Sequence, residues 1–215
     1  MFTRKERKMH YEILDKKRKD ILPLLAKLRD DFYLAGGTAL ALHLGHRDSV
    51  DFDFFTQKDI DTAELTERLK EIFKNHGITK IQEEKNTLSV LINKEIKLSF
   101  FTYKYPLLKD LHTEKNLSLA SLEDIGCMKL SAILGRSSNK DYIDIYYILK
   151  NIELETLLGL TQQKFPEIDP NPVLKSLVYF EDMEEEPIDF QKGKEVELEE
   201  IKNFLIKEVK KFYNC

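Results

Sequence analysis

The stretch that decides the fold is Leu34-Ala35-Gly36-Gly37-Thr38, which is followed after a short interval by Asp51-Phe52-Asp53-Phe54-Phe55. The apolar run before the glycines predicts a strand that stops at a turn, and Thr38 to Leu44 then predicts a helix. Val50 to Phe55 predicts a second strand. Because alternate residues of a strand share a face, the two aspartates are expected to project together while phenylalanines enter the core.

The aspartate pair, Asp51 and Asp53, suits a divalent metal. Neighbouring carboxylates repel each other, and each holds its proton longer as a result. A Mg²⁺ or Mn²⁺ ion between them removes that penalty, and hard oxygen ligands suit Mg²⁺. Because D-x-D also arises by chance on exposed strands, the pair taken alone leaves a purely structural explanation open.

The glycine pair suits a phosphate. Gly36 and Gly37 have no side chains, so they allow unusual backbone angles and close approach of a ligand. The helix that follows offers free N–H groups and a positive dipole end to phosphate, and Thr38 or Ser49 adds a hydroxyl. A glycine pair is also a common turn, but its order with the aspartates favours phosphoryl or nucleotidyl transfer with metal charge stabilisation.

The composition is that of a folded domain. The chain has 215 residues, of which 42% are hydrophobic, and its net charge of -4 gives no global reason to expect nucleic-acid binding. Residues 1–30 carry ten Lys or Arg against five Asp or Glu, whereas residues 181–200 carry two against ten. Solvated helix faces explain both runs, and a basic N-terminal helix that meets RNA or an acidic partner is the alternative.

The two cysteines, Cys127 and Cys215, have no spacing that pairs them and no metal-ligand cluster around them. Free thiols in a reducing cytosol are therefore expected. The charged N-terminus precedes no apolar run, and no stretch of about 18 apolar residues occurs. We therefore expect a cytoplasmic protein without a membrane partner.

The order of predicted elements indicates an α+β fold. A long charged helix is expected over residues 4–30, with Pro23 kinking or splitting it, and a second helix over residues 62–76. Strands are expected at residues 78–83, 87–92 and 95–102, the last two joined by a tight connection at Asn93-Lys94. Beyond Tyr105-Pro106 only helices are expected, at residues 121–136, 140–150, 153–165, 171–182 and 195–213.

Three parts follow from this order of elements. An N-terminal helix (residues 1–30) packs on the core, a small mixed-sheet α/β domain spans residues 31–110, and a helical domain spans residues 111–215.

The glycine–aspartate segment resembles a known family. Gly-Gly or Gly-Ser followed by Asp-x-Asp is the hallmark of the polymerase-β-like nucleotidyltransferase superfamily. More narrowly, Leu34 to Leu40 with His46-Arg47-x-Ser49-x-Asp51-Phe52-Asp53 looks like the AbiEii/AbiGii toxin branch. Later blocks are similar to the same branch: Leu122-Glu123-Asp124-Ile125 with Lys129 and Arg136, Lys140-Asp141-x-x-Asp144-Ile145-Tyr146, and Val178 to Glu184. The resemblance covers about residues 30–185.

The resemblance implies a metal-dependent nucleotidyltransferase of the AbiEii toxin type with an appended helical bundle. Such an enzyme would move a nucleotidyl group from a nucleoside triphosphate to an acceptor such as tRNA or another RNA, as the toxin of a toxin–antitoxin (abortive infection) system with a cognate antitoxin. Kinase-type phosphoryl transfer on the same fold and non-catalytic nucleotide binding remain alternatives.

The resemblance also implies a set of site residues. The implied catalytic residues are Asp51, Asp53, Lys129 and Asp141, of which Asp51 and Asp53 hold Mg²⁺ or Mn²⁺. The implied nucleotide-binding residues are Gly36, Gly37, Thr38, Arg47, Ser49 and Lys129.

Spacing alone leaves two explanations for the helical motifs. Lys129 and Arg136 are two helical turns apart, and Asp141 and Asp144 are three residues apart. If both helices border a cleft, Lys129 meets nucleotide phosphates, and Asp141 orients or deprotonates an attacking hydroxyl or ligates metal. The alternative is a salt-bridge network between helices, and spacing alone favours this alternative. For Lys129 and Asp141 the family resemblance favours the functional explanation instead. Asp144 could simply pair with Lys140.

One position departs from the superfamily pattern. Ser99 occupies the place of a third carboxylate on a later strand. Glu95 is a poor substitute, because four residues span roughly 13 Å along a strand. The site is therefore expected to use two carboxylates, to borrow Asp141 or Asp144, or to bind a nucleotide without turnover. Loss of one ligand weakens the second metal position most.

Two further groups have open roles. His43 and His46 lack a ligand constellation and are expected at the surface or in caps. The acidic run 181–189 is expected to be a solvated helix end or to shape the cleft.

Overall fold

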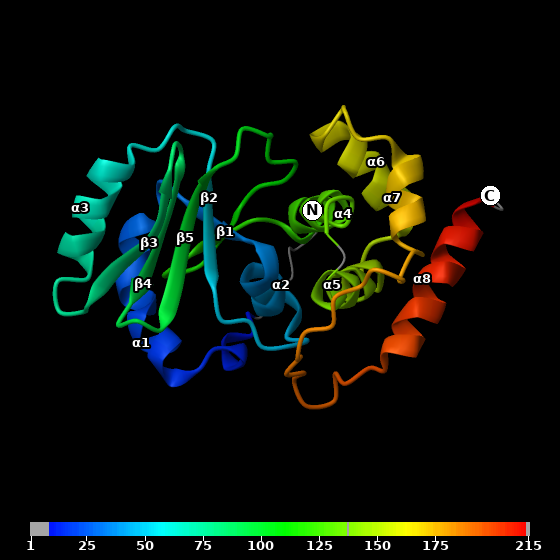
Figure 1. The fold of residues 1–215 in the computed structure, drawn as a ribbon, viewed down its shortest axis with the longest axis horizontal. Helices are drawn as coiled ribbons and strands as arrows, with labels where there is room; N and C mark the ends of the chain where they lie inside the picture. The colour runs from blue at the N-terminus through cyan, green and yellow to red at the C-terminus, as the bar shows by residue number, and fades with distance from the viewer. Residues whose placement is uncertain (1–8, 137, 214–215) are drawn as a thin grey trace, which may run out of the picture.

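A seven-stranded mixed sheet forms one half of the molecule in the computed structural model, which describes residues 9–136 and 138–213 (Figure 1). The strand order is β3-β4-β5-β2-β1-β7-β6. The bounds are β1 Tyr33–Ala35, β2 Phe52–Thr56, β3 Ile78–Glu84, β4 Thr87–Ile92, β5 Ile96–Thr102, β6 His112–Thr113 and β7 Ser118–Leu119. The α+β fold with a mixed sheet is thus confirmed.

The helices α4 to α8 gather at the end of the molecule opposite α3 (Figure 1). The bounds are α1 Lys16–Leu25, α2 Gly36–Leu44, α3 Thr62–Ile72, α4 Leu122–Ala132, α5 Asn139–Leu149, α6 Leu154–Lys164, α7 Pro170–Ser176 and α8 Leu198–Tyr213. Asp61 caps α3 and Ser121 caps α4 through side-chain hydrogen bonds to backbone N–H groups. No described helix is long and apolar enough to span a bilayer.

Three central strands bring the functional segments together. β1 and β2 are antiparallel, so the end of β1 at Ala35 lies opposite Asp53 near the beginning of β2. β5 runs parallel to β2 on its other side and places Ser99 opposite Asp53. Phe52 and Phe54 are buried in the core, whereas Asp53 is only partly covered, as the predicted alternation requires.

Several predicted boundaries are wrong. Of the helix expected over 4–30, residues 4–8 lie outside the described residues, and α1 begins only at Lys16 because Asp15 caps it by accepting a hydrogen bond from the Arg18 N–H. Pro23 lies inside α1 and does not split it. β2 begins at Phe52, so Asp51 precedes the strand. The helix expected over 171–182 ends at Ser176.

Two short strands were not predicted. β6 and β7 pair with each other, and β7 joins the sheet parallel to β1. Both follow Tyr105-Pro106, where only helices were expected. Two-residue strands carry too little hydrophobic periodicity to be recognised, since alternation needs about four residues to show. The predicted division at residue 110 stays a prediction.

The tight connection between β4 and β5 follows the prediction. Asn93 and Lys94 both have positive φ, of 52° and 60°. Two consecutive residues with positive φ are typical of the hairpin turns that match the twist of antiparallel strands. This hairpin fixes the register that places Ser89 opposite Ser99.

Candidate active site

The glycine pair lies where β1 ends and α2 begins. Gly36 has a φ of +71°, and a Cβ atom there would lie 3.3 Å from Oδ2 of Asp53. A Cβ on Gly37 would lie 2.9 Å from Nη2 of Arg47 and 3.3 Å from Oγ of Ser49. The residue before α2, Ala35, offers no side-chain cap. The first N–H groups of α2 therefore stay available to an anion beside the aspartates.

Asp51 and Asp53 border the same two cavities, although Asp51 precedes the strand. Burial raises the pKa of Asp53, and the charge of Asp51 raises it further, while Lys97 lowers it. The Asp53 carboxyl therefore costs free energy to ionise beside Asp51. A cation between them would remove that cost.

Thr38 holds the loop that leads to Asp51. Its hydroxyl lies 2.8 Å from Oγ of Ser49 and donates to the carbonyl oxygen of Asp51. Thr38 is 1% exposed and borders neither cavity, whereas Ser49 borders the larger one. The predicted hydroxyl for a ligand is thus available from Ser49, and Thr38 positions the metal-site loop.

Asp144 is the buried centre of an ion-pair network. Its carboxylate accepts hydrogen bonds from Nε and Nη2 of Arg47 at 2.8 and 2.9 Å, and its Oδ2 lies 2.6 Å from Nζ of Lys129. Burial alone would raise the pKa of Asp144, but the charges of Lys129 and Arg47 hold that pKa well below its usual range. The expected alternative partner, Lys140, instead lies 2.7 Å from Oε2 of Glu186.

Asp141 carries the network to the cleft surface. Nζ of Lys129 donates to Oδ1 of Asp141 at 2.7 Å, and Nε of Arg136 donates to Oδ2 at 2.8 Å. Lys129 and Asp141 are almost fully buried, whereas the Arg136 side chain is 65% exposed. The salt-bridge network is therefore present and forms a wall of the cleft, whereas the roles of Lys129 and Asp141 toward a nucleotide stay predictions.

The structure places His43 and His46 in the interior, so the surface or capping role predicted for them is wrong. Nε2 of His43 lies 2.9 Å from the carbonyl oxygen of Ala120, and Nε2 of His46 lies 2.8 Å from Oδ1 of Asp144. Burial lowers the pKa of His46 more than Asp144 raises it, so the neutral ring donates to the carboxylate. His46 is part of the motif that resembles the family, but a histidine at this position does not by itself predict a buried hydrogen bond to Asp144.

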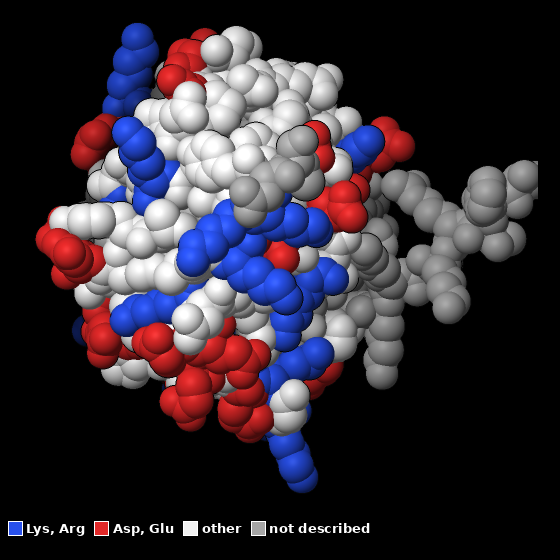
Figure 2. All heavy atoms as spheres, turned by 90° about the vertical axis from the view of Figure 1, so that its right-hand side faces the viewer, with Lys and Arg blue, Asp and Glu red and all other residues white. Residues whose placement is uncertain are grey.

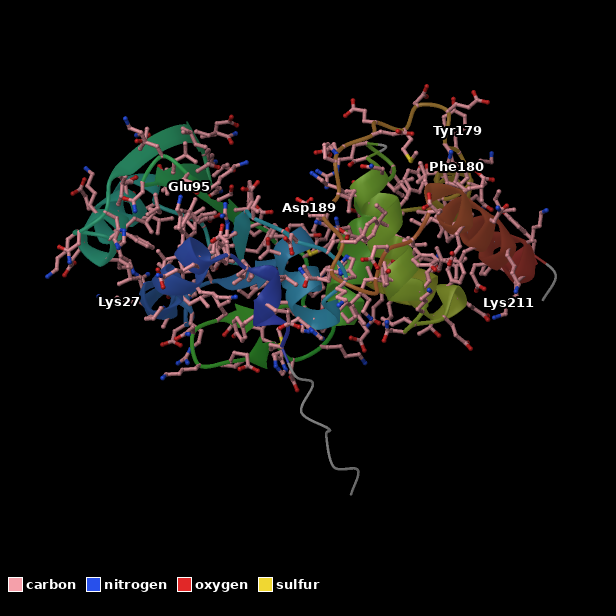
Figure 3. The ribbon with its side chains drawn as sticks, turned by 90° about the horizontal axis from the view of Figure 1, so that it is seen from below. Lys27, Glu95, Tyr179, Phe180, Asp189 and Lys211 are labelled. Carbon is pink, nitrogen blue, oxygen red and sulfur yellow. The ribbon has the colours of Figure 1, made fainter. Side chains whose placement is uncertain are left out.

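The acidic segment, residues 181–189, lies along the cleft, which Asp182, Glu184, Glu186 and Asp189 border. It follows α7 without helical structure, so its expectation as a helix end is wrong. Backbone hydrogen bonds hold it at both ends, from the Asn139 N–H to the Glu184 carbonyl at 3.0 Å and from the Asp48 N–H to the Asp189 carbonyl at 2.8 Å. In Figure 3, Asp189 lies between the half with Glu95 and the half with Tyr179 and Phe180.

A cleft of about 610 Å³ lies between the glycine–aspartate segment and the acidic segment. Eight predicted residues belong to the surroundings of this cleft or of the adjoining groove: Gly36, Gly37, Arg47, Ser49, Asp51, Asp53, Lys129 and Asp141. The guanidinium of Arg47 is committed to Asp144 and to the Asp48 carbonyl. Arg47 therefore holds Asp144 in place, and little of its charge is left for a ligand.

The groove is a second cavity, of about 480 Å³, on the other side of the same aspartates. It lies over the open face of the sheet and is closed on one side by α4. Ser99 borders it, and its buried hydroxyl lies beside the Asp53 carboxyl, where hydrogen bonding from Ser99 lowers the pKa of Asp53. At the position of the expected third carboxylate, the site therefore has a neutral hydroxyl beside Asp53.

The carboxylates of Asp51 and Asp53 fit one divalent cation whose remaining ligands come from substrate phosphates and waters. Asp51 and Asp53 supply two hard carboxylates, and no group of three or more His, Cys, Asp or Glu among residues 9–136 and 138–213 is arranged to hold a metal. Mg²⁺ is commonly bound by one or two carboxylates together with substrate phosphates and waters. The aspartates would hold the ion, whose charge would stabilise a developing phosphate charge.

Comparison with known proteins identifies relatives over most of the chain. The family model described as "Nucleotidyl transferase AbiEii toxin, Type IV TA system" matches residues 24–211. An uncharacterized protein from Aquifex aeolicus is 39% identical over 189 residues, which cover 85% of this chain and 88% of the relative.

Two solved structures share the fold. MenT4, a nucleotidyltransferase toxin from Mycobacterium tuberculosis, has a TM-score of 0.59 at 14% identity, covering 90% of this chain and 82% of its own. A protein from Helicobacter pylori, JHP933, has a TM-score of 0.58 at 20% identity, covering 94% of each chain.

Proposed function

The chain belongs to the AbiEii family of nucleotidyltransferase toxins, and we propose that it transfers a nucleotidyl group from a nucleoside triphosphate to an acceptor hydroxyl with Mg²⁺ or Mn²⁺ at Asp51 and Asp53. One observation carries the proposal. The free N-terminus of α2, the two aspartates and the ion pair of Lys129 with Asp141 all border one cleft. Phosphoryl and nucleotidyl transfer need this combination of positioning and charge stabilisation.

The triphosphate is proposed to lie against Gly37 and Ser49. The N–H groups at the start of α2 and the Ser49 hydroxyl would donate to phosphate oxygens. Lys129 would add positive charge, and its double pairing with Asp141 and Asp144 holds its ammonium in place. The glycine pair is required because side chains here would meet Asp53 or Arg47.

In the transfer itself, the acceptor oxygen forms a bond to the α-phosphorus, and the bond from that phosphorus to the bridging oxygen breaks. Pyrophosphate leaves, and the proton of the acceptor hydroxyl passes to Asp141 or to solvent. Asp141 is suited to orient the hydroxyl, because it borders the cleft and its contact with the exposed Arg136 can open.

The proposed acceptor is RNA, including tRNA, in a cytoplasmic toxin–antitoxin system with a protein antitoxin. Family membership supports the toxin role. A polyanionic partner is also supported by a band of Lys and Arg side chains on the face that carries α8 (Figure 2). This helix exposes Lys207, Lys210 and Lys211. Such bands attract nucleic acid through the phosphate backbone.

Ser99 motivates a second candidate, a nucleotide-binding protein without turnover. With serine in place of a third carboxylate, a second metal position lacks a charged ligand from this chain. Nucleotide binding would then depend on Asp51 and Asp53 as before, but no label would reach an acceptor.

The test uses nucleoside triphosphates labelled at the α- or γ-phosphate, incubated with the protein, Mg²⁺ or Mn²⁺, and total RNA or tRNA. Transfer of α-label that chelator abolishes is the expected result. Transfer of γ-label alone would support a kinase. Binding without transfer, alongside an active control enzyme, would favour the second candidate.

A further inference from the structure

We infer that the groove over the sheet binds the unpaired terminal nucleotides of a single-stranded RNA acceptor, with Phe55 and Phe101 as the stacking surface; this inference rests on the proposed transferase function. The cleft on the other side of the aspartates is then the place of the nucleoside triphosphate. Asp51 and Asp53 border both cavities, so donor and acceptor would meet at the metal site.

The aromatic surface is built into the sheet next to the aspartates. Phe55 and Phe101 are direct partners across β2 and β5, and Asp53 and Ser99 are partners two residues earlier. The two rings are half-buried, with centroids 5.3 Å apart. Residues two apart on a strand share a face at about 6.5–7 Å. A base stacked on these rings would therefore lie one strand repeat from the metal site.

The opposite wall of the groove is apolar. Ile125, Met128 and Ala132 of α4 border the same groove as the aromatic pair, and Ile125 is fully buried there. A slot with aromatic rings on one side and aliphatic groups on the other fits the flat faces of a nucleobase, and stacking accepts any base. Polar floor groups are present as well, because Ser89 and Ser99 also border the groove. The Ser99 hydroxyl, which lies beside Asp53, can also accept a hydrogen bond from a ribose hydroxyl.

Charge favours the acceptor strand in the groove over the cleft. The charged side chains around the groove are Lys97, Lys129, Arg136, Asp51 and Asp53, of which Lys129 and Arg136 are paired with Asp141. Lys97 forms no salt bridge among the described residues, although its charge lowers the pKa of Asp53, so its ammonium can contact an acceptor phosphate. The cleft instead carries the carboxylates of the acidic segment, which repel a phosphate chain.

The two cavities also differ in the size of ligand that their surroundings allow. The acidic segment crosses the cleft and is tied to both halves of the molecule, which suits a small molecule accompanied by a cation. The groove extends to β3, the edge strand, where Gln82 borders it and nearly every residue is exposed. A polymer can therefore continue from the groove into solvent past this edge.

The test measures two affinities on the full chain. Fluorescence anisotropy gives the affinity for a short RNA of mixed sequence, as a single strand and as a duplex, and calorimetry gives the affinity for Mg-ATP and the other three Mg-nucleotides. Phe101→Leu keeps an apolar side chain but removes the stacking face, and Lys97→Ala removes the ammonium proposed to contact an acceptor phosphate. Lys85→Ala, at an exposed position outside the groove, is the charge-matched control.

Phe101→Leu is expected to weaken RNA binding by at least about fivefold, since stacking on one aromatic ring is worth roughly 1–3 kcal/mol per base. Lys97→Ala is expected to reduce the slope of log affinity against log salt by about 0.7, the value for one phosphate contact on a single strand. Phe101→Leu should bind the Mg-nucleotides as the wild type does, and Lys85→Ala should change neither affinity.

Weaker nucleotide binding with unchanged RNA binding would overturn the inference, because the groove would then hold the donor base. Equal loss of binding to duplex and single-stranded RNA would also overturn it. Either result leaves the proposed transferase function standing. If instead the wild type binds no Mg-nucleotide, the proposed function itself fails, so the two failures are distinguishable.

Discussion

Asp53 on β2 lies directly opposite Ser99 on β5, across two parallel strands of the sheet. Ser99 thus occupies the position beside Asp53 where the superfamily pattern expects a third carboxylate, so this site has two. The pairing also places the buried Ser99 hydroxyl beside a carboxyl whose pKa is raised by burial and by Asp51 and lowered by hydrogen bonding from Ser99.

Replacing this serine by an acid should strengthen metal binding. Ser99→Asp adds a third carboxylate beside Asp51 and Asp53, so without metal the added repulsion should lower the melting temperature. Mg²⁺ should then raise it by more than it raises that of the wild type. Thermal unfolding with and without Mg²⁺ measures both effects, and Ser99→Asn is the uncharged control. The same Mg²⁺ shift in all three proteins would contradict the account.

Asp53 should make stability depend on pH in a recognisable direction. Its folded-state pKa is raised, so the unfolded chain loses this proton at lower pH than the folded protein, and stability falls as pH rises through that range. Asp53→Asn should therefore stabilise the metal-free protein at pH 7. The gain should vanish at low pH, where the carboxyl is protonated in both states. Urea unfolding in chelator at several pH values tests this, and a variant less stable at pH 7 would count against it.

Asp144 should be the most important carboxylate for stability. Asp144→Asn leaves Lys129 and Arg47 buried without their shared partner, which should cost about 3–5 kcal/mol of unfolding free energy. Glu186→Gln breaks the exposed pair with Lys140 and should cost no more than about 1 kcal/mol. Urea unfolding compares the two. Similar small losses would mean that the buried network contributes little to holding the cleft wall.

The two site glycines should tolerate alanine poorly. Gly36→Ala forces a left-handed conformation at a cost of roughly 1–2 kcal/mol and crowds Asp53, and Gly37→Ala displaces Arg47 or Ser49. Both should weaken Mg-nucleotide binding. The matched control is Gly159→Ala in α6, where a Cβ meets nothing within 4 Å and helix propensity predicts up to about 1 kcal/mol of stabilisation. Unchanged nucleotide affinity in Gly36→Ala and Gly37→Ala would place the phosphate elsewhere.

Much of the sheet and of its glycine–aspartate segment was predictable, because local signals specify it. The alternation at Phe52 to Phe54, the turn at Asn93-Lys94 and the cap at Ser121 are each readable within a few residues. The start of α1 was missed because the Asp15 cap competes with a continuous charged pattern.

The non-local parts of the site were not predictable from residue types. His46 and Asp144 are 98 residues apart in sequence, and only the fold shows that they pair inside the core. The course of the acidic segment likewise depends on backbone hydrogen bonds to Asp48 and Asn139, and no sequence pattern predicts these bonds. Such contacts join distant segments, whereas periodicity and capping signals are local.

The central claim, that Asp51 and Asp53 form the metal–nucleotide site, is tested most directly by calorimetric titration of Mg-nucleoside triphosphates. The wild type is compared with the Asp51→Ala, Asp53→Ala double variant, and circular dichroism checks that both are folded. The account predicts Mg²⁺-dependent binding by the wild type and its loss in the folded double variant. A folded double variant that binds the Mg-nucleotide with wild-type affinity would contradict it.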